Sequence, residues 1–243
     1  MKNWMIAVGA VFALAVVLFL SDRTVKSPAG VDLIRTPDQY LEANNKALQF
    51  AKPPFVKADN FEKLTDADLN NVREGLKYFE AMRVYQPLRI TCNFGAGKCF
   101  QILGEKERAA ERFEQAVYNR SYDPERDRAD IKATGIEAMA ELSEVSLDLA
   151  AEEIANSNSL SQANDQKGAD MAKQRAKVYY DKAFTNANQA VEAVPTAYRY
   201  LVDRANVYLA LKNEDLAKKD IAKAKALAPN DPKVKMAVSM VGL

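Results

Sequence analysis

The sequence predicts an all-α fold made of stacked helical hairpins, and three observations support this. Helix-opening residues recur along the chain, each before a stretch with apolar residues at helical spacing. No stretch alternates apolar and polar residues for long enough to predict a half-buried strand. A set of small and large apolar positions also recurs 108 residues later in the chain. The first set is Gly97, Phe100, Ala109, Phe113 and Ala116, and the second is Ala205, Tyr208, Ala217, Ile221 and Ala224.

The composition excludes several classes of function. The 34 basic and 33 acidic side chains nearly cancel, and without a basic block nucleic acid is not an expected ligand. The chain has no histidine, which excludes Ser-His-Asp and Cys-His catalysis and histidine-containing metal sites. The few glycines do not form a phosphate-binding loop. We therefore expect no enzymatic activity, no cofactor and no metal.

The two cysteines, Cys92 and Cys99, are seven residues apart in one predicted helix. They share a face but lie roughly 10 Å apart along the helix axis, which is beyond disulfide reach. We expect two small buried apolar side chains. The alternatives are a metal or redox pair and a bridge to a partner chain.

The N-terminus predicts a membrane anchor over residues 1–21. Residues 4–20 carry no charge, and seventeen residues are the lower limit for a spanning helix. A cleaved signal peptide is the alternative, but no small-x-small cleavage site comes directly after the apolar run. Residues 22–36 contain Pro28 and Gly30, have no apolar period and predict a linker.

The distribution of positive charges on the two sides of this anchor does not decide its orientation. Lys2 and the α-amino group on one side nearly balance Arg23 and Lys26 on the other. A very short tail before the apolar segment is typical of a signal anchor that exports the folded part of the chain. We expect a single-pass protein of a bacterial inner membrane with its folded part in the periplasm.

The first predicted helix spans residues 37–51. Thr36 is its N-cap, Pro37 is its first residue, and Gln39 completes a capping box. The adjacent Pro53 and Pro54 are predicted to end it.

A second helix, over residues 66–83, opens at Thr65. Its Gly75, Phe79 and Met82 have the spacing of the second helix of a hairpin. We expect it to pair with the helix at residues 37–51, although this hairpin matches the recurring pattern less closely.

The middle of the chain, residues 124–195, predicts one enlarged helix pair. A long helix over residues 125–155, a polar loop at residues 156–165 and a second long helix to Val194 account for its apolar spacing. Two ordinary but degenerate hairpins are the alternative. After the last hairpin, residues 232–241 predict a short capping helix.

The recurring pattern resembles the tetratricopeptide repeat (TPR). A small residue in the first helix permits close approach, an aromatic residue three positions later fills the gap, and two alanines flank a large residue in the second helix. Residues 90–123 and 198–231 match best, but Ser121 replaces the closing proline and Lys212 replaces the turn glycine. The resemblance implies a TPR-like domain over residues 37–243, in which hairpins stack because none can bury its apolar face alone.

The resemblance further implies a concave face, lined by first helices, that binds extended peptides or partner helices. The family's groove positions fall on Thr91, Phe94, Lys98, Gln101, Arg199, Val202, Asn206 and Leu209. An ordinary solvated surface is the alternative for each residue. Some family members hold a C-terminal carboxylate with a Lys and Asn pair; that pair is not reproduced here, so chaperone tails are not expected ligands.

The sequence thus predicts a membrane-anchored scaffold that binds and assembles protein partners, as an assembly factor or accessory subunit. One alternative is a structural subunit whose anchor packs within a membrane complex, since Gly9 and Ala13 permit close helix contact. Another is a membrane-surface hydrolase that uses carboxylates alone, but the sequence shows no Glu in a distinct apolar cleft.

Overall fold

The computed structural model describes residues 30–242, and its regular structure there consists of nine α-helices. They are α2 (Pro37–Asp59), α3 (Asp66–Tyr85), α4 (Ile90–Ile102), α5 (Lys106–Asn119), α6 (Ala129–Gln162), α7 (Gln166–Ala193), α8 (Tyr198–Ala210), α9 (Glu214–Leu227) and α10 (Pro232–Val241). This confirms the all-α prediction. The predicted anchor at residues 4–20 lies outside the described residues. Between residues 30 and 242, no helix is long and apolar enough to cross a membrane.

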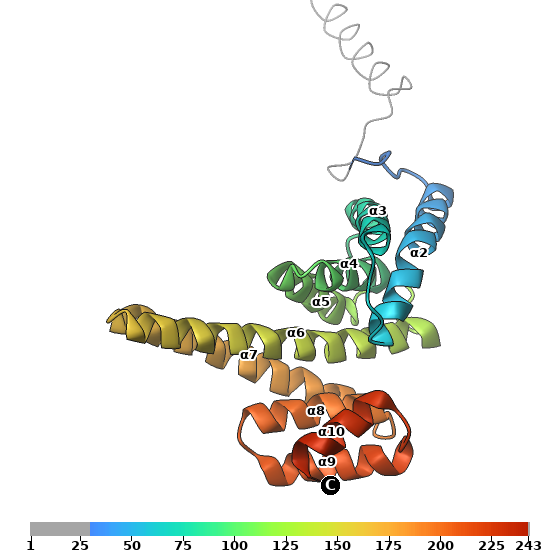
Figure 1. Cartoon of the computed structure of the whole chain (residues 1–243). Coiled ribbons are helices and arrows are strands. Elements are labelled where there is room, and N and C mark those ends of the chain that lie inside the picture. Colours follow the sequence, from blue (N-terminus) through green and yellow to red (C-terminus); the bar gives the residue numbers. More distant parts are fainter. Residues whose placement is uncertain (1–29, 243) are drawn as a thin grey trace, which may run out of the picture.

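The helices stack as four hairpins followed by α10 (Figure 1). The hairpins are α2 with α3, α4 with α5, α6 with α7, and α8 with α9. Each second helix also packs against the next first helix, and consecutive first helices contact one another. As a result one face of the stack, here called the inner face, is lined by α2, α4, α6, α8 and α10.

The turn inside each hairpin has the same geometry. The residue that follows the first helix or its cap has a left-handed backbone, and the next N–H donates back to a carbonyl of the helix. The left-handed residues are Phe61, Gly104, Asn164 and Lys212, with φ angles of 57°, 77°, 61° and 59°. The closing hydrogen bonds, at 2.8–2.9 Å, run from Glu62 to Lys57, Glu105 to Phe100, Asp165 to Leu160 and Asn213 to Tyr208. The repeat therefore extends to all four hairpins.

We expect Lys212→Gly to stabilise the protein by about 0.5–1 kcal/mol, because glycine adopts the left-handed conformation without the steric cost that a side chain incurs. Gly104→Ala, at the equivalent turn, should destabilise it by a similar amount. Urea unfolding of both variants measures the effect. Equal shifts of the same sign would contradict the shared turn geometry.

The two best-matched hairpins bury corresponding residues. In the α4 and α5 hairpin, Phe113 is fully buried against Gly97, where an added Cβ would lie 2.6 Å from the ring. The corresponding Ile221 and Ala205 are fully buried between α8 and α9. The small residue thus sets the approach distance of each pair.

Both cysteines are buried free thiols on α4. Burial raises the pKa of Cys99 and raises that of Cys92 to about 12, so neither thiol ionises readily near neutral pH. Their burial agrees with the expectation of two small apolar side chains.

Helix α2 corrects the prediction that Pro53 and Pro54 end it, because it continues to Asp59. Two prolines inside a helix remove two backbone hydrogen bonds. Burial offsets that loss: Pro54 is buried, and Ala51 packs against Gly75 of α3.

Helix α6 corrects the predicted loop at residues 156–165, because it runs on to Gln162. Serine and asparagine favour loops by competing for backbone hydrogen bonds, but Ser157 is satisfied across the hairpin. Its hydroxyl is buried and donates to the carbonyl of Ala169 at 3.0 Å. Residues 129–193 therefore form a single long helix pair.

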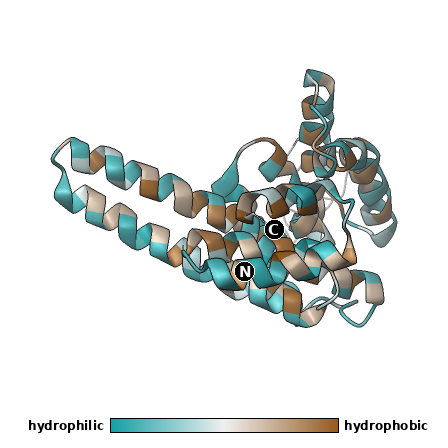
Figure 2. Ribbon diagram, turned by 60° about the horizontal axis from the view of Figure 1, so that its bottom comes forward, coloured by the Kyte–Doolittle hydropathy of each residue, from teal (hydrophilic) through white to brown (hydrophobic). Residues whose placement is uncertain are grey.

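This pair projects beyond its neighbours as an arm, with a hydrophilic tip (Figures 1 and 2). The arm buries small side chains between its helices, namely Ala150, Ser157, Ala169, Ala172 and Ala176.

The part of the predicted linker that the structure describes, from residue 30 on, packs against the fold. Ile34 is buried in the core of the first hairpins, and Val31 packs against the same core. The chain therefore reaches the fold beside α2 and α3.

Candidate functional site

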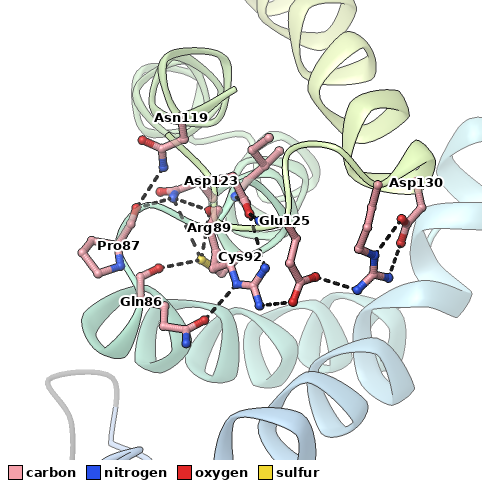
Figure 3. A network of polar contacts seen from close by, with 11 residues as sticks. Gln86, Pro87, Arg89, Cys92, Asn119, Asp123, Glu125 and Asp130 are labelled. Atoms are coloured by element: carbon pink, nitrogen blue, oxygen red, sulfur yellow. Dashed lines mark hydrogen bonds and ion pairs between the residues drawn. The ribbon is translucent and has the colours of Figure 1, made fainter. Parts of the chain in front are cut away.

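A buried aspartate fixes the start of α4, a helix that lines the inner face (Figure 3). Asp123 has no solvent exposure, and its carboxylate accepts a hydrogen bond from the backbone N–H of Ile90 at 2.7 Å. It also accepts from Arg89 at 3.3 Å and from the N–H of Glu125 at 2.8 Å. The second hairpin is thus closed at its base.

An aspartate 108 residues further on has the same role. Asp231 accepts from the hydroxyl of Tyr198, the first residue of α8, at 2.7 Å, and it caps α10. In the sequence each aspartate stands directly before a proline, which is typical of a helix start. The structure shows that each also holds the start of an inner-face helix.

The inner face contains a basin made of two adjoining hollows, with volumes of about 140 and 250 Å³. The smaller one, here called the cavity, lies between α6, α8 and α10. The larger hollow extends to α4 and the α2–α3 corner. The charged residues that line the basin are Asp59, Lys98, Glu137, Glu141, Glu144, Arg199, Asp203 and Lys233. Because they come from all four hairpins and α10, the stack curves around this basin.

Lys98 forms the buried centre of the basin wall. It is 7% exposed, and its ammonium lies 2.8 Å from Glu141 and 3.1 Å from Asp59. Burial alone would disfavour its charge, but the two carboxylates outweigh burial and raise its pKa. Its positive charge is therefore neutralised by carboxylates of the protein itself.

Lys233 joins the last helix to the first hairpin across the basin. Its ammonium lies 3.9 Å from Glu144 and 5.8 Å from the ring centroid of Phe61, at the α2–α3 corner. This cation contact closes one side of the basin.

Three charged groups of the basin have no ion pair or side-chain hydrogen bond with any other described residue: Glu137, Asp203 and Arg199. Burial, and secondarily the charge of Glu144, raises the pKa of Asp203 to about 7. Burial and Glu141 likewise raise the pKa of Glu137. Carboxylates whose pKa is raised by burial and by a neighbouring like charge are typical of functional sites.

The raised pKa of Asp203 predicts a pH-dependent stability. Between the unfolded pKa of about 3.9 and the folded value of about 7, the folded state keeps a proton that the unfolded chain has lost. Stability from this group is therefore full below pH ~4 and lost as the pH rises through 7. Asp203→Asn should thus stabilise the protein by about 1–3 kcal/mol at pH 8 and hardly at pH 4.

Urea unfolding at both pH values measures this difference. Asp181→Asn, at an exposed aspartate on α7, is the matched control and should show no such pH dependence. An equal effect of Asp203→Asn at both pH values would contradict the assignment.

The structure places the eight predicted groove residues unevenly. Lys98, Gln101 and Arg199 line the basin, and the Oε1 atom of Gln101 is buried without a hydrogen-bond partner among the described residues. Lys98 and Val202 are largely buried, and Val202 lines neither hollow. The other four, Thr91, Phe94, Asn206 and Leu209, are half-buried and lie outside the two hollows.

The acidic side of the basin was missed from the sequence. Glu137, Glu141 and Glu144 line one cavity, together with Arg199, Asp203 and Lys233. The spacing of the glutamates, four and three residues, places them on one helical face and was a visible signal. No local signal brings Asp203 or Lys233 to the same place.

Known proteins that match this chain come from the solved structures. No protein-family model and no curated protein matches the chain. A solved structure described as YrrB, a TPR protein with an unusual peptide-binding site, is similar at 13% identity and a TM-score of 0.26. The match covers 83% of this chain and 97% of that chain.

A second solved structure, of the APC/C hetero-tetramer Cut9-Hcn1, is similar at 16% identity and a TM-score of 0.25. The match covers 84% of this chain and 46% of that chain, so this chain spans less than half the length of its counterpart. The shared turns and the corresponding buried residues of the hairpins show the repeat directly. The described chain is an all-α helical repeat.

Proposed function

We propose that this chain is a membrane-tethered scaffold that binds a polypeptide partner in its basin. The observation that carries the proposal is the basin itself, which is lined by every hairpin and holds unpaired charges on its walls. Curved stacks of helical hairpins present such a face to partner chains.

The cavity alone is smaller than a typical small-molecule pocket. Small-molecule pockets typically measure about 300–1,000 Å³, whereas the cavity measures about 140 Å³. One side chain fits such a space, and the adjoining hollow gives the rest of an extended segment a place to lie. An elongated ligand uses both hollows.

A membrane tether supplies the second part of the proposal. Residues 4–20 have the composition of an anchor, and the chain enters the fold through residues 31–34, beside α2 and α3. A partner in the basin would then be held close to the membrane, with the folded part in the periplasm. Carbonate extraction of membranes tests this: the full chain should stay in the pellet, and a chain that begins at residue 30 should be released.

Site-specific photo-crosslinking tests the binding surface. A photoreactive phenylalanine analogue at Gln101 or Tyr200, both in the basin, should crosslink the same partner. The matched control is Tyr118 on α5, whose side chain is exposed away from both hollows. Glu137→Arg, which places a large side chain in the cavity, should reduce crosslinking from the basin positions. Equal labelling from Tyr118 would contradict binding in the basin.

Purification in mild detergent separates the forms of this function. One stoichiometric membrane complex would indicate an accessory or structural subunit, and many clients would indicate a recruiting scaffold. The same preparation tests a carboxylate-only hydrolase, which the raised pKa values of Glu137 and Asp203 in one cavity bring into consideration. Glycan cleavage lost in Asp203→Asn would favour that activity.

A further inference from the structure

We infer that the partner presents a lysine or arginine side chain, and that this cation enters the cavity between α6, α8 and α10. The inference rests on the proposed function and specifies the chemistry of the partner. The occupant is a side chain of a polypeptide, since the basin continues past the cavity into the larger hollow.

The first step is the charge of the basin. Five carboxylates line it against three cations. Of the cations, Lys98 is committed to Asp59 and Glu141, and Lys233 reaches Glu144 at 3.9 Å. A cationic side chain in the cavity would favour the ionised forms of Glu137 and Asp203, and their negative charge would then complement it.

The second step is the hydrogen-bonding chemistry of the walls. Glu137 and Asp203 accept no hydrogen bond from any other described residue. In the adjoining larger hollow, Gln101 adds an acceptor, because its Oε1 atom is buried without a partner in the described part of the chain. A ligand rich in donors would satisfy these acceptors, and lysine, arginine and a peptide backbone provide such donors.

The third step asks whether the occupant is a cationic side chain or a metal ion. Within residues 30–242, no three His, Cys, Asp or Glu residues are close enough together to hold one metal ion. Tyr200 lines the same cavity, and an aromatic ring beside a guanidinium or ammonium group adds a cation–π contact. Arg199 is the opposing feature, since it repels a cation from the shared wall, but the carboxylates outnumber it.

The experiment uses the full chain in detergent and an immobilised array of random nonapeptides whose central residue is fixed in turn as each amino acid. We expect the strongest binding with Arg or Lys at the centre and the weakest with Asp or Glu. The double variant Asp203→Asn, Glu137→Gln should lower the preference for a central cation about tenfold. Asp181→Asn should keep it.

The outcomes are distinct. Peptide binding without a preference for Arg or Lys, or a preference unchanged in the double variant, would overturn this inference and leave the proposed function standing. No binding to any peptide would overturn both. Spermidine tests whether the cation comes from a free polyamine instead. Binding of spermidine without binding of any peptide would show that the cation does not belong to a polypeptide. Circular dichroism of each variant verifies folding, which neutral, isosteric replacements of unpaired carboxylates should preserve.

Discussion

Lys98→Met is expected to lower the free energy of unfolding by about 3–5 kcal/mol, as measured by urea denaturation at pH 7. Lys98 is buried and serves as counter-ion to Glu141 and Asp59, at 2.8 and 3.1 Å. Its removal leaves the carboxylate of Glu141 buried without compensation, and that penalty is larger than the net value of the pair itself.

Two controls define this prediction. Adding Glu141→Leu to Lys98→Met should recover most of the loss, because no uncompensated buried charge remains. Lys46→Met removes a lysine whose pair with Glu42 is exposed, and it should change stability little. If Lys98→Met lowered the free energy of unfolding no more than Lys46→Met, burial would not make the pair of Lys98 with Glu141 more important than an exposed pair.

Asp123→Ala is expected to destabilise the protein by about 2–4 kcal/mol. The substitution removes the acceptor of two backbone N–H groups, those of Ile90 and Glu125, and leaves the buried start of α4 unsatisfied. Thermal unfolding followed by circular dichroism measures the loss.

The repeat supplies the matched comparison. Asp231→Ala changes the equivalent aspartate, which is partly exposed and lies near the C-terminal end of the stack, where water can replace lost hydrogen bonds. Its effect should be clearly smaller. If Asp231→Ala proved the more costly, burial would not be what makes the junction at Asp123 important.

Helices and turns could be predicted because their signals are local. Thr36 and Thr65 cap helices where the sequence placed them, and Gly104 marks a turn that Lys212 also adopts. The predicted helix ends were wrong where buried packing outweighed low helix propensity. The prolines within α2 and the serines of α6 favour a break in isolation, and only their buried contacts explain why the helices continue.

The basin could not be read from the sequence beyond Lys98, Gln101 and Arg199. The family pattern gave those positions, and the periodicity of Glu137, Glu141 and Glu144 was visible. The sequence does not specify how strongly the stack bends. That bend brings Asp203 and Lys233 to the same cavity and decides which charges remain unpaired.

The contact of Lys233 with Phe61 has a consequence for cooperativity. In an open stack of repeats each hairpin touches only its neighbours, so melting can start at either end and spread inwards. Here the side chain of Lys233 also reaches Phe61 at the first corner, so fraying of α10 removes a contact from the opposite end of the stack. This one cation–π contact couples the two ends weakly, since such contacts contribute about 0.5–1 kcal/mol at exposed sites.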